Sequence, residues 1–209
     1  MNKLVLLRHG QSQWNLENKF TGWTDVPLTK KGINEAKNAG NLIKKNNIKF
    51  DKIFSSVLER ANKTAEIAIN QTNSEDLYED NKLVYEKNKN LNERDYGDLV
   101  GLNKNETAEK FGKEQVHIWR RSYDIPPPNG ESLKDVVRRV SPYFEKEIEP
   151  LLNEGKNILI VAHGNSLRAI MINVGLYEPK EISSIELPTG SPLCLNYNSG
   201  KLIKHYYLD

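Results

Sequence analysis

Three segments of the chain share one pattern, in which a short apolar run leads into a polar turn and then into a helix. The apolar runs are Lys3–Leu7, Lys52–Phe54 and Asn157–Ala162, and helical patterns over 57–69 and 166–174 follow the last two. Apolar strands that alternate with helices are typical of parallel strands covered on both faces. The pattern therefore predicts a mostly parallel sheet with helices on either side.

Two longer helices and a hairpin complete this outline. Thr29–Lys45 carries apolar residues at helical spacing behind a threonine that can cap its start. Glu131–Leu152 has the same spacing after a Ser-x-x-acid start signal, and Pro142 inside it predicts a kink or a break. Leu193–Tyr197 and Leu202–Tyr207 flank an Asn-Ser-Gly turn, which predicts a β-hairpin at the sheet edge.

The stretch from about 92 to 128 is polar, contains three glycines and ends in three prolines. We expect short helices and loops here, forming a small cap over the carboxyl ends of the strands. The predicted fold is therefore α/β, a three-layer sandwich with a mostly parallel central sheet and this cap. A length of 209 residues suits a single domain spanning 1–209.

Composition narrows the possible partners. The chain has 30 basic and 28 acidic residues, a formal net charge of +2, which gives no electrostatic support for nucleic-acid or membrane binding. Its one cysteine, Cys194, cannot form an intrachain disulfide and is expected to be a small buried apolar residue. We see no signal peptide and no apolar run long enough to span a bilayer, so a reducing cytoplasm is expected.

Candidate chemistry gathers at two of the predicted strand ends, where ligands bind in open α/β sheets. His9 and His163 each follow an apolar strand and precede a glycine. A lone histidine is more often structural, but two independent strand–His–Gly turns make coincidence a poor explanation. Arg8 directly precedes His9, and Arg60 lies one turn into the second helix. Arginine disfavours a metal cation and recognises phosphate well, so the set favours an oxyanion.

Neutral imidazole is a competent nucleophile near pH 7 and can accept a phosphoryl group in line. Arginine and a second histidine would stabilise the charge on the transferring group. A separate acid or base must serve the leaving or attacking oxygen. Glu93 is a candidate because it lies in a loop between elements, although spacing alone does not exclude a plain surface carboxylate.

A series of motifs, in order along the chain, resembles the 2,3-bisphosphoglycerate-dependent phosphoglycerate mutases of the histidine phosphatase superfamily. The resemblance runs from about Lys3 to Tyr207. Arg-His-Gly alone would be a weak signal, but the ordered set is highly specific. The motifs are Leu7–Asn15, Phe20–Trp23, Leu91–Arg94, Gly101–Lys104, Trp119–Arg121, Ala162–Arg168 and Pro188–Gly190.

The resemblance implies a metal-independent enzyme that interconverts 3-phosphoglycerate and 2-phosphoglycerate in glycolysis and gluconeogenesis, with 2,3-bisphosphoglycerate as the priming phosphoryl donor. It implies that His9 is the nucleophile, Glu93 the proton donor and acceptor, and His163 a stabiliser of the phosphoryl group, which Arg8 and Arg60 help to hold. The implied binding residues for phosphoryl group, substrate and carboxylate are Ser12, Asn15, Thr21, Gly22, Arg94, Tyr96, Lys104, Arg120, Arg121, Gly164 and Asn165.

Three features depart from the family pattern. Asp95 stands where histidine is common, and we expect its carboxylate to point away from the site or to pair with an arginine, Arg94 first. A direct junction over 126–132 replaces an insertion that contributes to subunit contacts in longer members, so a monomer or homodimer is expected. The chain stops at Asp209 without the family's flexible tail, so water is expected to reach a phosphorylated His9 more easily.

Two other functions compete with the mutase. A phosphatase of the same superfamily would use the same His9 with water as the acceptor, but Lys104, Arg120 and Arg121 favour retention of an intermediate. A balance shifted towards bisphosphoglycerate synthesis is a minor variant of the mutase. A non-catalytic binding module is disfavoured because the histidines, arginines and Glu93 are all present.

Overall fold

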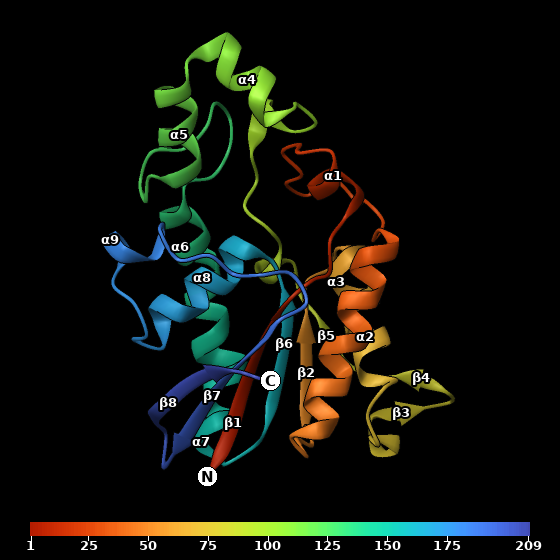
Figure 1. Ribbon diagram of the computed structural model, residues 1–209. Coiled ribbons are helices and arrows are strands. Elements are labelled where there is room, and N and C mark those ends of the chain that lie inside the picture. The colour runs from red at the N-terminus through yellow and green to blue at the C-terminus, as the bar shows by residue number, and fades with distance from the viewer.

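The computed structural model describes residues 1–209 and is built around a six-stranded sheet (Figure 1). The strand order is β5-β2-β6-β1-β7-β8. Five of the strands run in the same direction, and β7 runs opposite to them. The strands are β1 (Asn2–Arg8), β2 (Lys52–Ser55), β5 (Glu86–Lys87), β6 (Ile158–Ala162), β7 (Pro192–Asn198) and β8 (Lys201–Tyr207). The mostly parallel sheet and the hairpin at its edge are confirmed.

Helices cover both faces of the sheet, so the three-layer sandwich is also confirmed. Figure 1 shows α2 and α3 on one side, and α6, α7 and α8 on the other. A small hairpin, β3 (Tyr78–Glu79) with β4 (Lys82–Leu83), lies apart from the main sheet. The helices are α1 (Gln13–Leu16), α2 (Lys30–Lys45), α3 (Glu59–Ile69), α4 (Lys104–Phe111), α5 (Lys113–Arg121), α6 (Leu133–Tyr143), α7 (Glu149–Asn153), α8 (Gly164–Asn173) and α9 (Pro179–Ile182).

The central strands are apolar throughout because each face of the sheet has its own core. Leu4 and Leu6 point into the core beneath α6 and α8, whereas Val5 and Leu7 point into the core beneath α2 and α3. Successive side chains of a strand face opposite sides, which explains why a continuous apolar run was needed. Cys194 is fully buried in the second core, as expected.

The predicted helices form, with some differences at their ends. Thr29 caps α2 by accepting a hydrogen bond from the Gly32 N–H, as expected. The expected helix over 131–152 is divided into α6, a wider π-helical segment over Phe144–Ile148, and α7. The helix is interrupted as expected, but α6 continues through Pro142 to Tyr143, and a missing N–H at Pro142 affects the turn before it. The π-helical segment comes directly before Pro150, which also lacks a backbone N–H.

The structure differs from the expected elements at the starts of two helices and in three short strands. The helix predicted from 57 begins at Glu59, and the one predicted from 166 begins earlier, at Gly164. β5 and the β3–β4 hairpin were also missed, because strands of two residues are too short to show a period. None of the helices combines the length and apolarity needed to cross a membrane.

The segment predicted as a cap lies over the carboxyl ends of the strands, at the top of Figure 1. It consists of a 3₁₀ turn over Gly97–Leu99 followed by α4 and α5. A small apolar cluster of Phe20, Leu99 and Val116 joins it to the loop after α1. The cap therefore encloses the edge of the sheet where β1 and β6 end.

Candidate active site

His9 and His163 lie side by side because the strands that precede them are neighbours. β1 and β6 run parallel with Arg8 opposite Ala162, so both chain segments leave the sheet at the same edge. The two imidazole rings have centroids 5.0 Å apart and planes inclined at 58°. Both are almost completely buried, with 2% of His9 and 0% of His163 exposed. The predicted pairing of the two histidines is thus present in the structure.

The surroundings of His9 leave one of its ring nitrogens available. Its Nδ1 lies 2.7 Å from the carbonyl oxygen of Gly10, which can only accept, so Nδ1 carries the proton. Burial, the positive charge of Arg60 and that of Arg8 together lower the pKa of His9 well below 6.5. The ring is therefore neutral at pH 7, and Nε2 keeps an unshared electron pair.

His163 is held from the opposite side by a serine. Its Nε2 is 2.7 Å from the Ser56 hydroxyl, which in turn accepts a hydrogen bond from the Leu58 N–H. Its Nδ1 is buried and has no hydrogen-bond partner. Burial and then Arg60 are the main causes that lower the pKa of His163. An unpartnered polar atom in such a position is costly to bury, so this nitrogen is suited to a ligand.

Two arginines flank the histidines, Arg60 buried and Arg8 half-buried. Arg60 donates through its Nη2 to the Gly22 carbonyl at 2.8 Å and through its Nη1 to the Thr24 carbonyl at 2.9 Å. Burial is the main cause that lowers its pKa to about 10, so it stays charged at neutral pH. Arg8 donates to the Leu187 carbonyl at 2.7 Å, while its buried Nε has no partner. Both retain charge for an anion beside His9.

Glu93 lies at the same site and is ionised. One carboxylate oxygen accepts hydrogen bonds from the Arg94 N–H at 2.8 Å, the Asn165 N–H at 3.1 Å and the Asn165 amide at 3.0 Å. Burial raises the pKa of Glu93, but these bonds and the charges of Arg8 and Arg60 outweigh it and leave the pKa below its ordinary value. The surface-carboxylate interpretation is therefore wrong, since Glu93 is held inside the site.

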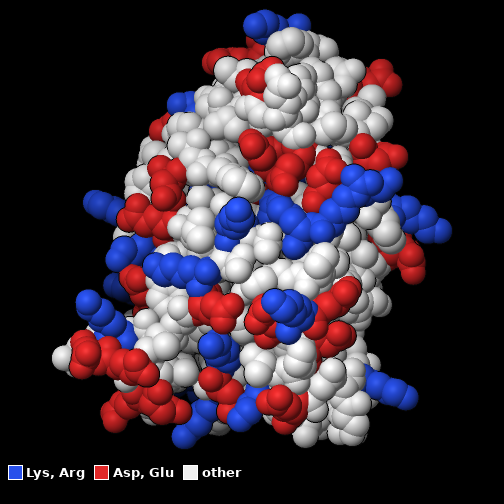
Figure 2. Space-filling model, turned by 180° about the vertical axis from the view of Figure 1, so that it is seen from behind, with Lys and Arg blue, Asp and Glu red and all other residues white.

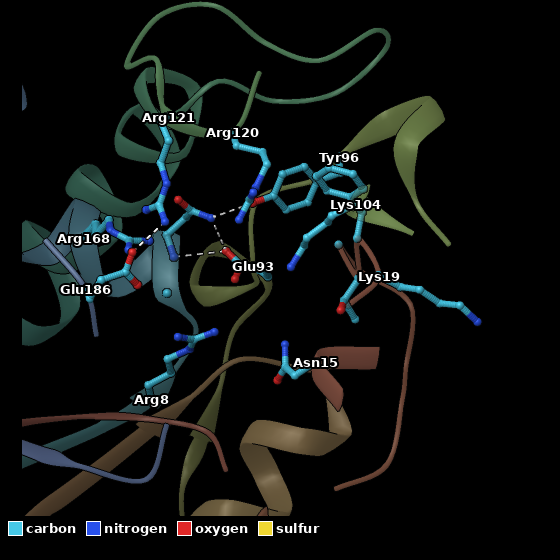
Figure 3. A pocket seen from close by; sticks show the side chains of 15 residues that line it. Arg8, Asn15, Lys19, Glu93, Tyr96, Lys104, Arg120, Arg121, Arg168 and Glu186 are labelled. Carbon is cyan, nitrogen blue, oxygen red and sulfur yellow. Dashed lines mark hydrogen bonds and ion pairs between the residues drawn. The ribbon is translucent and has the colours of Figure 1, made fainter. Parts of the chain in front are cut away.

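A cavity of about 230 Å³ opens beside these groups, between the strand ends and the cap (Figure 3). Six cationic side chains and only two carboxylates line it, and several of the cations point into it. Elsewhere, on the face seen in Figure 2, basic and acidic side chains are interspersed. The cavity lining is Arg8, Asn15, Lys19, Phe20, Thr21, Gly22, Glu93, Tyr96, Lys104, Arg120, Arg121, Gly164, Asn165, Arg168 and Glu186.

Most of the predicted site residues belong to this lining, but a few do not. His9 and His163 are covered, and each is adjacent in sequence to a lining residue, Arg8 or Gly164. Arg60 is buried beneath the loop that it anchors. Ser12 is buried as the cap of α1, where it accepts from the Asn15 N–H and leaves the Asn15 side chain at the cavity (Figure 3).

Arg94 and Asp95 serve the cap rather than the cavity. Arg94 is fully buried and donates through Nη2 to the carbonyls of Trp119 and Arg120 at the end of α5. The expected ion pair between Asp95 and Arg94 does not form, so that expectation is wrong. Instead, the Asp95 carboxylate accepts the Gly97 N–H at 2.9 Å, because an aspartate before a tight turn can bond its own backbone.

Four lining residues were not among the predicted site residues: Lys19, Phe20, Arg168 and Glu186. Phe20 and Arg168 fall inside the quoted motifs, so that signal was present. Lys19 and Glu186 lie outside them, in loops whose course the periodicity could not predict. Glu186 places a carboxylate in a cationic cavity, where it pairs with Arg121 at 2.6 Å.

Comparison with known proteins agrees with this geometry. The sequence model of the histidine phosphatase superfamily, branch 1, matches residues 4–208. The chain is 50% identical to a 2,3-bisphosphoglycerate-dependent phosphoglycerate mutase of Parvibaculum lavamentivorans, over 92% of this chain and 89% of that protein. It is 53% identical to the protein of the same name from Methylocella silvestris, over 91% and 89%.

The fold is shared more widely. The alpha-ribazole phosphatase from Shigella flexneri superimposes with a TM-score of 0.80 at 24% identity, covering 99% of this chain and 96% of that one. Identity this low shows the fold alone, whereas the two bacterial mutases are similar over nearly their whole length. The chain belongs to branch 1 of the histidine phosphatase superfamily and, within it, to the family of the 2,3-bisphosphoglycerate-dependent phosphoglycerate mutases.

Proposed function

We propose that this protein is a phosphoglycerate mutase that interconverts 3-phosphoglycerate and 2-phosphoglycerate through a phosphohistidine on His9. The observation that carries the proposal is a neutral, buried His9 with a free Nε2, beside a cavity lined by six cations. Relatives about 50% identical carry the name of this activity. Its place in metabolism is a step of glycolysis and gluconeogenesis.

His9 is the proposed nucleophile. Its Nε2 forms a bond to phosphorus as the bond from phosphorus to the substrate oxygen breaks, and the electron pair of that bond stays with the oxygen. Arg8, Arg60 and His163 would compensate charge on the transferring oxygens, since both arginine charges act on His9 and the His163 ring lies 5.0 Å from it. The unpartnered Arg8 Nε and His163 Nδ1 are the buried polar atoms that a phosphoryl group would satisfy.

Glu93 is the proposed proton carrier. In one direction it gives a proton to the oxygen that leaves phosphorus, and in the other it removes the proton from the attacking hydroxyl. The carboxylate is ionised before substrate binds, so it is ready to act as a base towards a monophosphoglycerate when His9 is phosphorylated. Its hydrogen bonds to Asn165 keep it at the cavity wall.

The cavity lining fits a small ligand with phosphates and a carboxylate. Lys104, Arg120 and Arg121 extend from the cap, and Arg8 from the sheet, so cations lie on different sides of the cavity. The same features suit 2,3-bisphosphoglycerate, which supplies the phosphoryl group that primes His9. The remaining predicted binding residues, Ser12 and Arg94, would act by shaping α1 and α5.

A coupled assay tests the proposal directly. The protein is given 3-phosphoglycerate with and without 2,3-bisphosphoglycerate, and 2-phosphoglycerate and free phosphate are measured together. We expect isomerisation that depends on the bisphosphate, and labelling of the protein with an acid-labile, alkali-stable phosphate. Full labelling of a His9→Ala variant would refute the assignment of the nucleophile.

The same assay separates the competing functions. Release of phosphate without isomerisation would favour a phosphatase with water as acceptor. Binding of phosphoglycerate with neither product would favour a non-catalytic module.

We further predict that the activity survives an excess of EDTA. The positive charges of Arg8 and Arg60 next to the histidines oppose a divalent cation at this position. Loss of activity on chelation, and its return with added metal, would contradict a metal-independent mechanism.

Four broader expectations accompany the proposal. A glycolytic role makes the cytoplasm the expected place of action, with phosphoglycerates rather than nucleic acids or membranes as partners. We propose that residues 1–209 act as a single domain. A monomer or a homodimer is expected, which sedimentation would test.

A further inference from the structure

Arg139 of α6 donates hydrogen bonds to the segment that carries Glu93 and to Glu131, just before α6. Its Nε and Nη2 donate to the two carboxylate oxygens of Glu131 at 2.8 and 2.9 Å. Its remaining donors reach three backbone carbonyls, those of Asn90 at 2.7 Å, Asn92 at 3.1 Å and Glu93 at 2.9 Å. The side chain is 16% exposed, so these bonds are largely shielded from water.

Trp23 completes this arrangement from the loop after α1. Its indole N–H donates to the same Glu93 carbonyl at 2.6 Å, and its ring centroid lies 5.7 Å from the Arg139 guanidinium. The Glu93 carbonyl thus accepts two donors, from α6 and from a loop about 70 residues earlier. Nothing proposed above for phosphoryl transfer uses either side chain.

We propose that Arg139 is a positioning residue for Glu93, which it holds through the backbone with Trp23 as its partner. This inference rests on the proposed function, since it concerns the proton carrier of that reaction. Arg139 itself lines no part of the cavity. Alongside burial, the main cause, its positive charge also contributes to lowering the pKa of His163, an effect that Arg139→Lys retains. Its effect on the reaction therefore passes through the place of Glu93 and through this charge, and through no contact with substrate.

The physical reason lies in how Glu93 is held. Residues 92–96 have no regular secondary structure, so no helix or strand ladder fixes their carbonyls. The arginine guanidinium has five N–H donors in a rigid planar arrangement, so it can hold several carbonyls in place at once. If the backbone shifts, the Glu93 carboxylate leaves Asn165, whose two hydrogen bonds come from a different element, α8. A displacement of about 1 Å of a catalytic group costs on the order of 100-fold in rate.

The neighbouring arginine provides a matched control. Arg138 is on the same helix, is 68% exposed, and pairs only with Asp135. The variants Arg139→Met, Arg139→Lys and Arg138→Met are compared in the coupled assay across pH, with circular dichroism to check folding. Trp23→Phe is added because Trp23 is 42% exposed, so its removal leaves the core intact while deleting one donor to Glu93.

In Arg139→Met we expect kcat to fall by about 100-fold, with KM for 3-phosphoglycerate within about twofold of wild type because the cavity cations are untouched. The acidic limb of the pH profile should move to higher pH, since burial raises the pKa of Glu93 once the Asn165 bonds no longer oppose it. Arg139→Lys and Trp23→Phe should show smaller changes of the same kind, and Arg138→Met none.

The inference is overturned if folded Arg139→Met keeps the wild-type kcat and acidic limb, or if its kcat and KM deteriorate together as in general loss of structure. If Arg139→Met does not fold, Trp23→Phe decides: an unchanged kcat and pH profile in that variant would overturn the inference. A wild-type protein that fails to interconvert phosphoglycerates would instead refute the proposed function.

Discussion

At the scale of single residues, the two site histidines are kept neutral at a cost to stability in acid. Burial and the nearby arginines lower the pKa of both His9 and His163 below 6.5. The same effect keeps His9 nucleophilic at neutral pH. A neutral imidazole is what phosphoryl transfer requires, and a protonated one has no free electron pair to offer.

This predicts a loss of stability below pH 6.5. Between the folded pKa and about 6.5 the unfolded chain binds more protons than the folded one, so stability falls as pH falls and levels off beneath the folded pKa. Each histidine contributes up to about 1.4 kcal/mol per pH unit. Urea unfolding of His163→Gln at several pH values should show a smaller acid loss than wild type. The exposed His117→Gln should match wild type, and equal losses in all three would contradict the prediction.

Glu186 shows that a carboxylate can lie in an anion site without preventing its use. Its side chain is 68% exposed and pairs with Arg121, so the pair is weak and easily displaced. Removing its charge in Glu186→Gln should lower KM for 3-phosphoglycerate by about two- to fivefold at low salt. Steady-state kinetics test this, with the exposed cap residue Glu109→Gln as a control. An unchanged or higher KM would show that Glu186 does not compete with substrate.

The site residues that could be identified from the sequence are those that lie at the end of a strand. His9, His163 and Arg8 follow from that rule because parallel strands end at one edge. Lys19 and Glu186 could not be predicted, since they reach the cavity through loops whose path depends on tertiary packing. The carboxylate of Asp95 was misassigned because its own turn offered a closer donor than Arg94.

At the scale of elements, the start of α2 determines where His9 sits. A Cβ on Gly32 would lie 2.1 Å from the carbonyl oxygen of Gln11, so the helix approaches the segment after His9 as closely as backbones allow. Gly10 lies between His9 and Gln11 in the sequence, and its N–H donates to the Thr64 hydroxyl of α3. Two helices therefore hold the carbonyl that fixes the His9 tautomer.

We therefore predict that Gly32→Ala destabilises the protein despite the better helix propensity of alanine. The overlap is with backbone, so it can be relieved only by moving α2 away from Gln11. Overpacking of this kind costs about 1–3 kcal/mol, against a gain of at most about 1 kcal/mol in propensity. Thermal unfolding and kcat should both fall. Asn38→Ala, at an exposed position of α2, should be neutral or stabilising; a stable and active Gly32→Ala would contradict the prediction.

The helices and strands that could be predicted are those with a strong period and a clear cap. The strands β1 and β6 have continuous apolar runs, and α2 has Thr29 at its start. β5 has only two residues and lies at the sheet edge, so it has no period of its own. The π-helical segment lies between Pro142 and Pro150, and its wider hydrogen-bond pattern does not follow from either proline alone.

At the scale of the whole molecule, charge is distributed so that attraction for anions is local. The net charge is +2, yet six cations and two carboxylates line the cavity between sheet and cap. Three of those cations, Lys104, Arg120 and Arg121, come from the cap and were expected from motifs rather than from charge counts. The cap thus concentrates positive charge over the strand ends (Figure 3), whereas basic and acidic side chains are interspersed on the face seen in Figure 2.

Such an arrangement predicts that salt weakens substrate binding without slowing the chemical step. The Debye length is about 10 Å at 0.1 M salt and about 3 Å at 1 M, so partly exposed cavity cations are screened while buried Arg60 is not. Raising NaCl from about 0.1 M to about 1 M should increase KM for 3-phosphoglycerate several-fold and leave kcat unchanged. Lys104→Met should raise KM and reduce its dependence on salt, whereas Lys45→Met, exposed at the end of α2, should behave as wild type. Equal salt dependence in all three proteins would mean that overall charge, and not the cavity, attracts the substrate.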